Sequence, residues 1–291
     1  MSEMDPQPIY ETETPVLYET RGPVAIVTMN RPRYSNAQNN QMTYALDDAL
    51  MRAAGDDDVA AIILCGAGRN FSGGHDLGTP GRDSHIPIAD RRTPWWNAVG
   101  KPGVEQQYVR EQEVYLGMCR RWRELPKPTI AAVQGACIAG GLMLAWMCDI
   151  IVASRDAFFL EPALSMGVPG VEYFAHAFEM SPRIAREFLL MGEKMDAERA
   201  YAVGMVNRLA QPETLMEEAM AVAERLATRS RFSLALAKQM MNFIDDVQGK
   251  RAAMDGAFAF HQLGHAHNQL SGESLIGRQT KDSMRDNTKD S

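Results

Sequence analysis

The fold is decided by residues 131–150, which read AAVQGACIAGGLMLAWMCDI. With the two residues before it, the start of this stretch gives Thr129–Val133, an apolar run with the length of a strand buried on both faces. A glycine-rich loop follows, then a short helix over about Gly141–Met147 and a further strand over Ile150–Ala153. This order predicts an α/β protein in which a backbone loop lies at the carboxyl end of a buried strand.

The same region has to be distinguished from a membrane span. Pro128–Cys148 carries no charge and is about long enough to cross a bilayer. However, Gln134 and three glycines interrupt the run, and neither end carries a belt of Tyr, Trp or Lys side chains. We therefore expect a buried strand, loop and helix, and no membrane partner.

A related unit lies upstream. The apolar run Val59–Leu64 is followed by the glycine-rich loop GAGRNFSGGHD at residues 66–76. Before it, Val16–Glu19 and Val24–Met29 predict a hairpin, and an apolar stripe over residues 42–53 predicts a helix that packs on the sheet. Ligands of open α/β sheets bind beyond the carboxyl ends of strands, so the 66–76 loop is a candidate site.

The rest of the chain suggests one large core with additions. Residues 78–104 are rich in Gly, Pro, Arg and Asp without periodicity, which predicts a surface insertion in which Trp95 and Trp96 form one wall of an apolar pocket. A helix is expected over about Tyr108–Leu125, and the chain from Ser181 onward reads as almost wholly helical. We assign an N-terminal tail (1–14), a core (15–205) with its insertion at about 78–107, a helical C-terminal region (206–272) and a polar tail (273–291).

Composition excludes several classes of protein. The 291 residues are 45% apolar and 23% charged, as a folded domain requires, and the net charge of −7 disfavours nucleic acid as a partner. The four cysteines form no C-x-x-C pair, and the acidic N-terminus shows no apolar leader. These features predict free thiols and a cytoplasmic setting.

Three familiar motifs fail on inspection. A dinucleotide fingerprint would need glycine where Phe71 stands, and a phosphate-binding loop would need Lys and Ser/Thr where Gly74 and His75 stand. His261 and His265 have a spacing that suits a metal on a helix, but no carboxylate or thiolate lies at a supporting spacing. We therefore expect surface or interface histidines there, and no metal.

The two glycine-rich loops are more informative. Each places approachable backbone N–H groups beside a buried strand, and the second also opens a helix whose dipole favours negative charge. Together they would form an oxyanion hole; taken singly, each is a tight strand-to-helix turn. The residues alone leave both interpretations open.

Three motifs in register carry a resemblance to a known family. They are Asn30-Arg31-Pro32 with Asn36-Ala37, GAGRNFSGGHDL at 66–77, and the stretch at 131–150. They resemble the enoyl-CoA hydratase/isomerase (crotonase) superfamily over about Val16 to Leu209, with a looser match to about Leu270. The resemblance implies a crotonase-like spiral of repeated ββα units with a helical C-terminal trimerisation region. It also implies a homotrimer or a dimer of trimers, an acyl-CoA thioester as substrate, and no cofactor beyond coenzyme A as part of that substrate.

The resemblance also implies roles for individual residues. The N–H groups of His75 and Gly140 would hold the thioester oxygen, and the segment from Asn30 to Asn36 would line the CoA nucleotide. The residues expected to bind substrate or CoA are Asn30, Arg31, Arg33, Asn36, Gly73, Gly74, His75, Asp76, Leu77, Gly140, Gly141, Met143 and Ala163.

The sequence departs from the family pattern at the acid/base positions. Where family hydratases carry two glutamates, this chain has Met143 and Ala163, which can neither activate water nor deliver a proton. Glu172 is the leading substitute. The alternative interpretation is that Glu172 lies at the start of a helix and complements the helix dipole. Glu161 and the side chain of His75 are further candidates. Glu105, Glu111 and Glu113 are weaker ones, since they suit a solvated helix face.

Two hypotheses follow from this departure. The first is an enzyme in which His75, Gly140 and Glu172 stabilise an enolate and move protons, for hydration, isomerisation, decarboxylation or thioester hydrolysis. The second is a noncatalytic acyl-CoA-binding or assembly subunit that kept the oxyanion hole and lost the chemistry.

Overall fold

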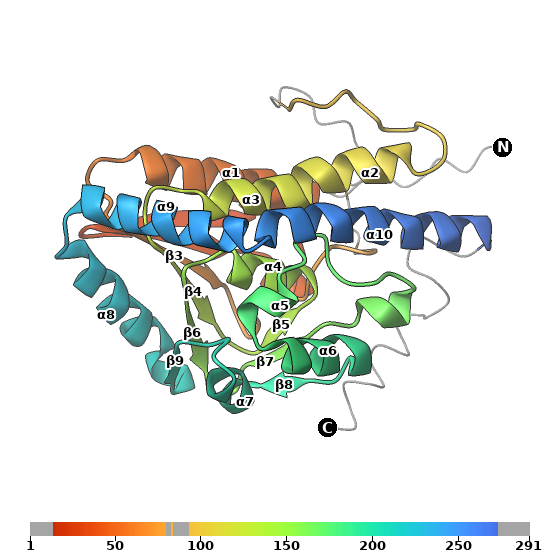
Figure 1. The fold of residues 1–291 in the computed structure, drawn as a ribbon. Helices are drawn as coiled ribbons and strands as arrows, with labels where there is room; N and C mark the ends of the chain where they lie inside the picture. The colour runs from red at the N-terminus through yellow and green to blue at the C-terminus, as the bar shows by residue number, and fades with distance from the viewer. Residues whose placement is uncertain (1–13, 80–82, 84–92, 273–291) are drawn as a thin grey trace.

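The computed structural model describes residues 14–79, 83 and 93–272, and it contains two sheets (Figure 1). The larger sheet has the order β1-β2-β3-β4-β6-β9. Only its first pair is antiparallel. Its strands are β1 (Val16–Arg21), β2 (Val24–Met29), β3 (Ala61–Gly66), β4 (Thr129–Val133), β6 (Ile150–Ser154) and β9 (Arg208–Ala210).

The smaller sheet lies beyond the carboxyl ends of the larger one. It has the order β5-β7-β8 and consists of β5 (Ala136–Ile138), β7 (Phe158–Leu160) and β8 (Met195–Asp196). Each of β4 and β6 continues after a short turn into a strand of this second sheet. The loop after β3 joins it through a single bridge between Ser72 and Cys137. The units that begin with β4 and β6 thus each add one strand to both sheets, which agrees with the predicted spiral of ββα units.

Helices cover both faces of the larger sheet. On one face α8 (Leu215–Ala227) packs its buried Leu215, Ala219 and Val222 against the strands. On the other face α1 (Asn40–Gly55) begins where the Asn39 side chain accepts a hydrogen bond from the Met42 N–H. These two layers hold the site loops between rigid elements.

One long helical segment runs over the site. It consists of α2 (Glu105–Glu111), a π-helical turn at Gln112–Gly117 and α3 (Met118–Arg123). The helices α9 (Arg231–Val247) and α10 (Lys250–Leu270) lie alongside it (Figure 1). Ion pairs of 3.0 Å from Arg123 to Asp246 and 2.8 Å from Arg120 to Asp255 join the two layers.

The remaining helices are short and lie nearer the smaller sheet. They are α4 (Gly140–Trp146), α5 (His176–Glu179), α6 (Pro182–Met191) and α7 (Ala197–Ala202), with 3-10 turns at Pro32–Tyr34, Ala163–Met166 and Pro212–Thr214. None of the helices in the described segments is both long and apolar enough to cross a membrane.

The structure refines some details of the sequence prediction. The region after Ser181 is almost wholly helical, as expected, apart from β8 and β9, whose two or three residues are too few to show a period. Trp95 packs against Trp96 and Tyr108 and lines no part of the cavity described below. The free thiols are confirmed for all four cysteines. The predictions for the two tails fall on residues 1–13 and 273–291, outside the described residues, as does part of the insertion.

Candidate functional site

The loop after β3 brings His75 against the loop that opens α4. Gln38 forms a parallel bridge with His75, in which the Gln38 N–H donates to the Gly74 carbonyl and the Asp76 N–H donates to the Gln38 carbonyl. Gly74 has φ +95°, and a Cβ added there would lie 2.8 Å from the carbonyl oxygen of Ile138 and 3.2 Å from the Gly140 nitrogen. Glycine is therefore required at this contact, because a side chain would force the two loops apart.

Two backbone N–H groups are left available where these loops meet. Gly140 is the first residue of α4, and His75 is the bridge residue whose own N–H is not used in the ladder. Within the described residues, neither N–H donates to a protein acceptor. The two groups can therefore act as donors to an anionic oxygen, as an oxyanion hole requires.

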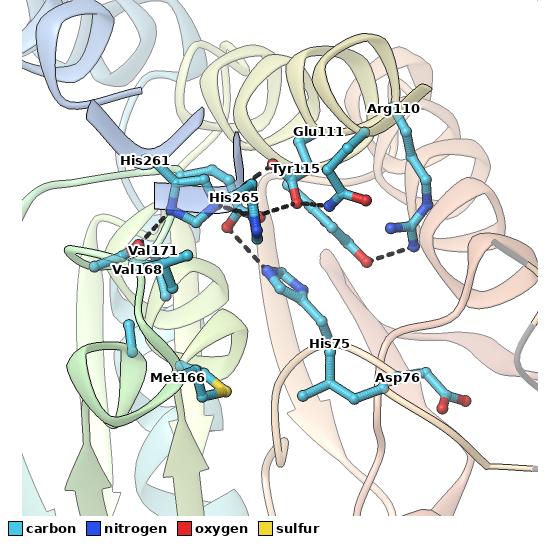
Figure 2. Close-up of a pocket in the computed structure, with 16 residues that line it drawn as sticks. His75, Asp76, Arg110, Glu111, Tyr115, Met166, Val168, Val171, His261 and His265 are labelled. Atoms are coloured by element: carbon cyan, nitrogen blue, oxygen red, sulfur yellow. Dashed lines mark hydrogen bonds and ion pairs between the residues drawn. The ribbon is translucent and has the colours of Figure 1, made fainter. Parts of the chain in front are cut away.

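The His75 side chain is held on three sides (Figure 2). Its Nε2 lies 2.9 Å from Oε2 of Glu172, and its ring stacks on Tyr115 with centroids 3.6 Å apart. A Cβ added to Gly140 would lie 2.6 Å from His75 Nδ1, so this nitrogen faces the second loop. His75 Nδ1 is buried and has no hydrogen-bond partner among the described residues. Glu172 thus orients the ring by one nitrogen and leaves the other facing Gly140.

Tyr115 supports the imidazole from the π-helical turn. Its hydroxyl accepts a 2.6 Å hydrogen bond from Arg110, whose Nε donates to Asn40 over 3.1 Å. Burial raises the pKa of Tyr115 above its usual range, so the phenol stays neutral. The ring is therefore a rigid platform and not a competing acid.

Next to His75 and Glu172 lies a second group of buried ionisable side chains. His261 Nε2 lies 3.7 Å from Oε1 of Glu172 and 3.4 Å from Oε2 of Glu111, and His265 Nε2 lies 3.2 Å from Oε1 of Glu111. Burial alone would lower the pKa of His261, but the hydrogen bond to Glu111 and the charges of Glu172 and Glu111 raise it to about 9. Burial likewise opposes ionisation of Glu172, yet its pKa is lowered, chiefly by the charge of His75.

A cavity of about 70 Å³ lies between these groups. Figure 2 shows Met166, Val168 and Val171 on one side and the His75, Tyr115 and α10 side chains opposite them. The wall is thus apolar on one side and ionisable on the other. The lining residues are His75, Asp76, Leu77, Gln107, Arg110, Glu111, Tyr115, Ala139, Ala163, Met166, Val168, Gly170, Val171, Glu172, His261 and His265.

Several predicted site residues come together here. His75, Leu77, Ala163 and Glu172 line the cavity, and Gly140 adjoins His75. Gly73 and Gly141 are packed against Ser35 and Ser72 as parts of the two loops. Glu172 lies in a loop four residues before α5 begins, so it is not the helix-start glutamate of the alternative interpretation.

Other predicted residues lie apart from the cavity. Met143 is buried in the core and is not part of the cavity wall. Glu161 faces His176 at 3.3 Å, also outside the cavity lining.

The segment from Asn30 to Asn36, predicted to bind CoA, is held in place by buried side chains of its own. Arg31 and Asn36 are buried, and the Asn36 amide donates to the carbonyls of Ala67 and Asn70. Asn30 donates to the carbonyl of Thr14, while Arg33 is exposed. Asp76 lines the cavity edge, but its carboxylate turns away from the ionisable group (Figure 2) and pairs with Arg31.

The prediction was wrong for three cavity residues. Glu111 was expected on a solvated helix face, and His261 and His265 at the surface or an interface, yet all three are buried within the described chain itself. Glu113 is buried as well. The available signal was the four-residue spacing of the histidines; their carboxylate partner comes from a helix far earlier in the chain, which spacing alone does not reveal.

Comparison with known proteins settles the family. A family model described as enoyl-CoA hydratase/isomerase matches residues 19–99 and 97–276. The chain belongs to the enoyl-CoA hydratase/isomerase family. It is an enzyme of the hydratase/isomerase type, and the predicted crotonase-like fold and family are both confirmed.

Relatives of this family member come from several bacteria. A putative enoyl-CoA hydratase of Mycobacterium tuberculosis is 40% identical over 272 residues, which cover 89% of this chain and 84% of the relative. A probable enoyl-CoA hydratase of Rhizobium meliloti is 34% identical over 80% of this chain and 82% of its own length. A crystal structure of a probable enoyl-CoA hydratase from Mycobacterium smegmatis superposes with a TM-score of 0.80 at 40% identity, covering 90% of this chain and 98% of the other.

Proposed function

We propose that this enzyme acts on an acyl-CoA thioester and that His75 and Glu172 form its acid/base pair. The observation that carries the proposal is the imidazole of His75, which is bound to Glu172 at one nitrogen and directs the other at Gly140. In this arrangement the proton-transferring group and the two oxyanion donors lie where the His75 loop meets the start of α4.

The oxyanion hole supplies the first part of the chemistry. When the α-carbon of a thioester loses a proton, negative charge moves to the thioester oxygen, and the N–H groups of His75 and Gly140 are available to hold it. Each such preorganised donor contributes about 3–4 kcal/mol in measured oxyanion holes. A backbone donor does this whatever its side chain is, which leaves the imidazole free for a second role.

Proton transfer is the second part. In the tautomer that donates Nε2–H to Glu172 and carries no proton on Nδ1, the His75 imidazole presents a lone pair on Nδ1. Nδ1 can take the α-proton and later return it to another carbon or to the leaving oxygen, while the carboxylate stabilises the intervening imidazolium. This pair replaces the carboxylates that Met143 and Ala163 cannot supply. The step involves no cofactor.

The surrounding residues suggest how the substrate lies. The acyl group would extend from the two loops into the cavity between Met166 and α10, where one wall is apolar. The CoA nucleotide would follow the segment from Asn30 to Asn36, of which Arg33 is the exposed cation. The cytoplasm, where acyl-CoA thioesters are used, is the proposed location.

Product analysis tests this function. The wild-type enzyme is incubated with 2-enoyl-CoA and 3-enoyl-CoA thioesters of several chain lengths, and with saturated acyl-CoA in heavy water. We expect either addition of one water or movement of the double bond, and deuterium uptake at the α-carbon, because all three pass through the same enolate. CoA-thioester binding without product or deuterium uptake would favour the noncatalytic binding subunit, and absence of binding would contradict the proposed site.

We also propose a homotrimer or a dimer of trimers assembled through the C-terminal helices. The outer sides of α9 and α10 expose large apolar side chains that the described chain leaves uncovered. These are Phe232, Leu236, Met240, Met241, Phe243, Ile244, Val247, Phe260, Leu263 and Leu270.

Phe243→Glu is expected to lower the assembled mass. The Phe243 side chain is 67% exposed, so a charge there harms the isolated subunit little but is costly once buried between subunits. Light scattering after gel filtration measures the mass. Leu17→Glu, at a 46% exposed position on the edge strand β1, serves as the matched control and should retain the wild-type mass. Equal masses for both variants would contradict an interface on these helices.

A further inference from the structure

Three side chains of the cavity converge on one point beside the proposed acid/base pair. Glu111 comes from the end of α2, and His261 and His265 come from one face of α10. The two Nε2 atoms are 2.9 Å apart, and the Glu111 oxygens lie 3.2 Å from His265 Nε2 and 3.4 Å from His261 Nε2. One ligating atom of each residue lies within 4.8 Å of those of the other two.

With Glu111 Oε1 facing His265 and Oε2 facing His261, these separations are close to the edge lengths of a metal coordination polyhedron. Ligand atoms about 2.0–2.1 Å from a common ion, at octahedral or tetrahedral angles, lie roughly 2.9–3.4 Å from one another. We propose that Glu111, His261 and His265 bind one divalent first-row transition-metal ion. Imidazole and carboxylate ligands together suit Zn²⁺, Fe²⁺, Co²⁺ or Mn²⁺ better than Ca²⁺ or Mg²⁺, which prefer oxygen alone.

The groups around the three ligands hold them in the orientation that an ion requires. His261 donates from Nδ1 to the Gly170 carbonyl over 2.6 Å, which directs its Nε2 at the point of convergence. The Glu111 carboxylate accepts hydrogen bonds from the side-chain amides of Gln107 and, at 2.5 Å, Gln262. Such outer partners of a histidine and a carboxylate are typical of metal sites and reduce the entropy lost on binding.

The charge of the cavity favours a cation there. Glu111 and Glu172 are both buried, with Glu172 Oε1 3.7 Å from His261 Nε2. Two carboxylates on either side of one buried imidazole are stabilised by positive charge, which a divalent ion can provide in place of a protonated histidine. A divalent ion would supply it while leaving both histidines neutral, as metal ligands are.

The remaining coordination positions would face the cavity. All three ligands line it together with His75 and Glu172, so water or an oxygen atom of a bound acyl group could complete the coordination shell. The ion would thus lie at the α10 side of the cavity, apart from the oxyanion donors. The inference concerns metal binding alone and does not depend on the proposed acyl-CoA reaction.

Cobalt binding tests this site without measuring turnover. Wild-type protein, stripped with a chelator and dialysed, is titrated with Co²⁺ while visible absorption and calorimetry are recorded. We expect one equivalent to bind with the ligand-field bands of a nitrogen/oxygen site and to raise the melting temperature. His265→Ala and Glu111→Gln should each weaken binding by more than the roughly 10–100-fold that loss of an outer partner costs.

His267→Ala is the matched control. His267 lies two residues beyond His265 on the same helix but is exposed, so its loss should leave the cobalt affinity and spectrum unchanged. Circular dichroism of each variant verifies folding, and Glu111→Gln keeps the volume of the side chain if His265→Ala perturbs α10. Absence of binding by folded wild type would overturn the inference. So would binding that survives both ligand variants or is lost with His267 alone.

Discussion

Glu172→Gln is expected to lower kcat for the thioester reaction by about 10²–10⁴-fold, the usual contribution of a positioned acid/base group. Glutamine keeps the volume but cannot stabilise the imidazolium that forms when His75 takes a proton. Its amide also presents a donor where the 2.9 Å hydrogen bond needs an acceptor, which favours the wrong tautomer or ring orientation. Steady-state kinetics and the rate of α-deuterium exchange measure the loss.

Two further variants make this prediction specific. Glu113→Gln neutralises a buried glutamate of the π-helical turn that is not part of the cavity wall, and it should leave kcat close to wild type. If His75 and Glu172 act as a unit, adding His75→Ala to Glu172→Gln should cost little beyond the more severe single variant. Wild-type kcat in Glu172→Gln, or fully additive losses in the double variant, would contradict the pair.

Arg31→Ala is expected to destabilise the fold by about 3–5 kcal/mol, as removal of one partner from a buried ion pair does. The Arg31 side chain is fully buried, lies 3.1 Å from the Asp76 carboxylate and donates to the Ala37 carbonyl. Its loss leaves the buried Asp76 carboxylate, next to His75 in the same loop, without its ion-pair partner. Chemical denaturation measures the change in unfolding free energy. Arg33→Ala, at an exposed position two residues away, should change it little.

The Arg31–Asp76 ion pair makes the free energy of unfolding depend on pH in a defined direction. Burial would raise the pKa of Asp76, but hydrogen bonds from Thr79 and Gly78 and the charge of Arg31 outweigh it, and the pKa is lowered. A lowered pKa stabilises the fold fully above the unfolded value of about 4, and this contribution is lost as pH falls through the folded value. In Arg31→Ala the acid-induced loss should be smaller than in wild type. An unchanged acid limb would show that Arg31 does not set the ionisation of Asp76.

The sequence predicted the fold because two glycine-rich loops after buried strands are strong and local signals. His75, Gly140 and Glu172 could be singled out from these loops and from the missing glutamates at Met143 and Ala163. What sequence alone could not show is contact between distant helices. Glu111 meets His261 and His265 only because the C-terminal helices fold back along α2 and α3. The internal role of Arg31 escaped prediction for the same reason, since its partner Asp76 belongs to another loop.

The two sides of α10 serve different surroundings. His261 and His265 point into the cavity, whereas Phe260 and Leu263 on the same turns are 67% and 64% exposed. A helix moves nearly as a rigid rod, so a shift imposed on its outer side must displace the cavity wall by a similar amount. If subunits associate through the outer side of α10 and substrate binds in the cavity, as proposed, the two events would be thermodynamically linked. Subunit association would alter the affinity for substrate, and substrate binding would alter the association equilibrium, through the position of α10.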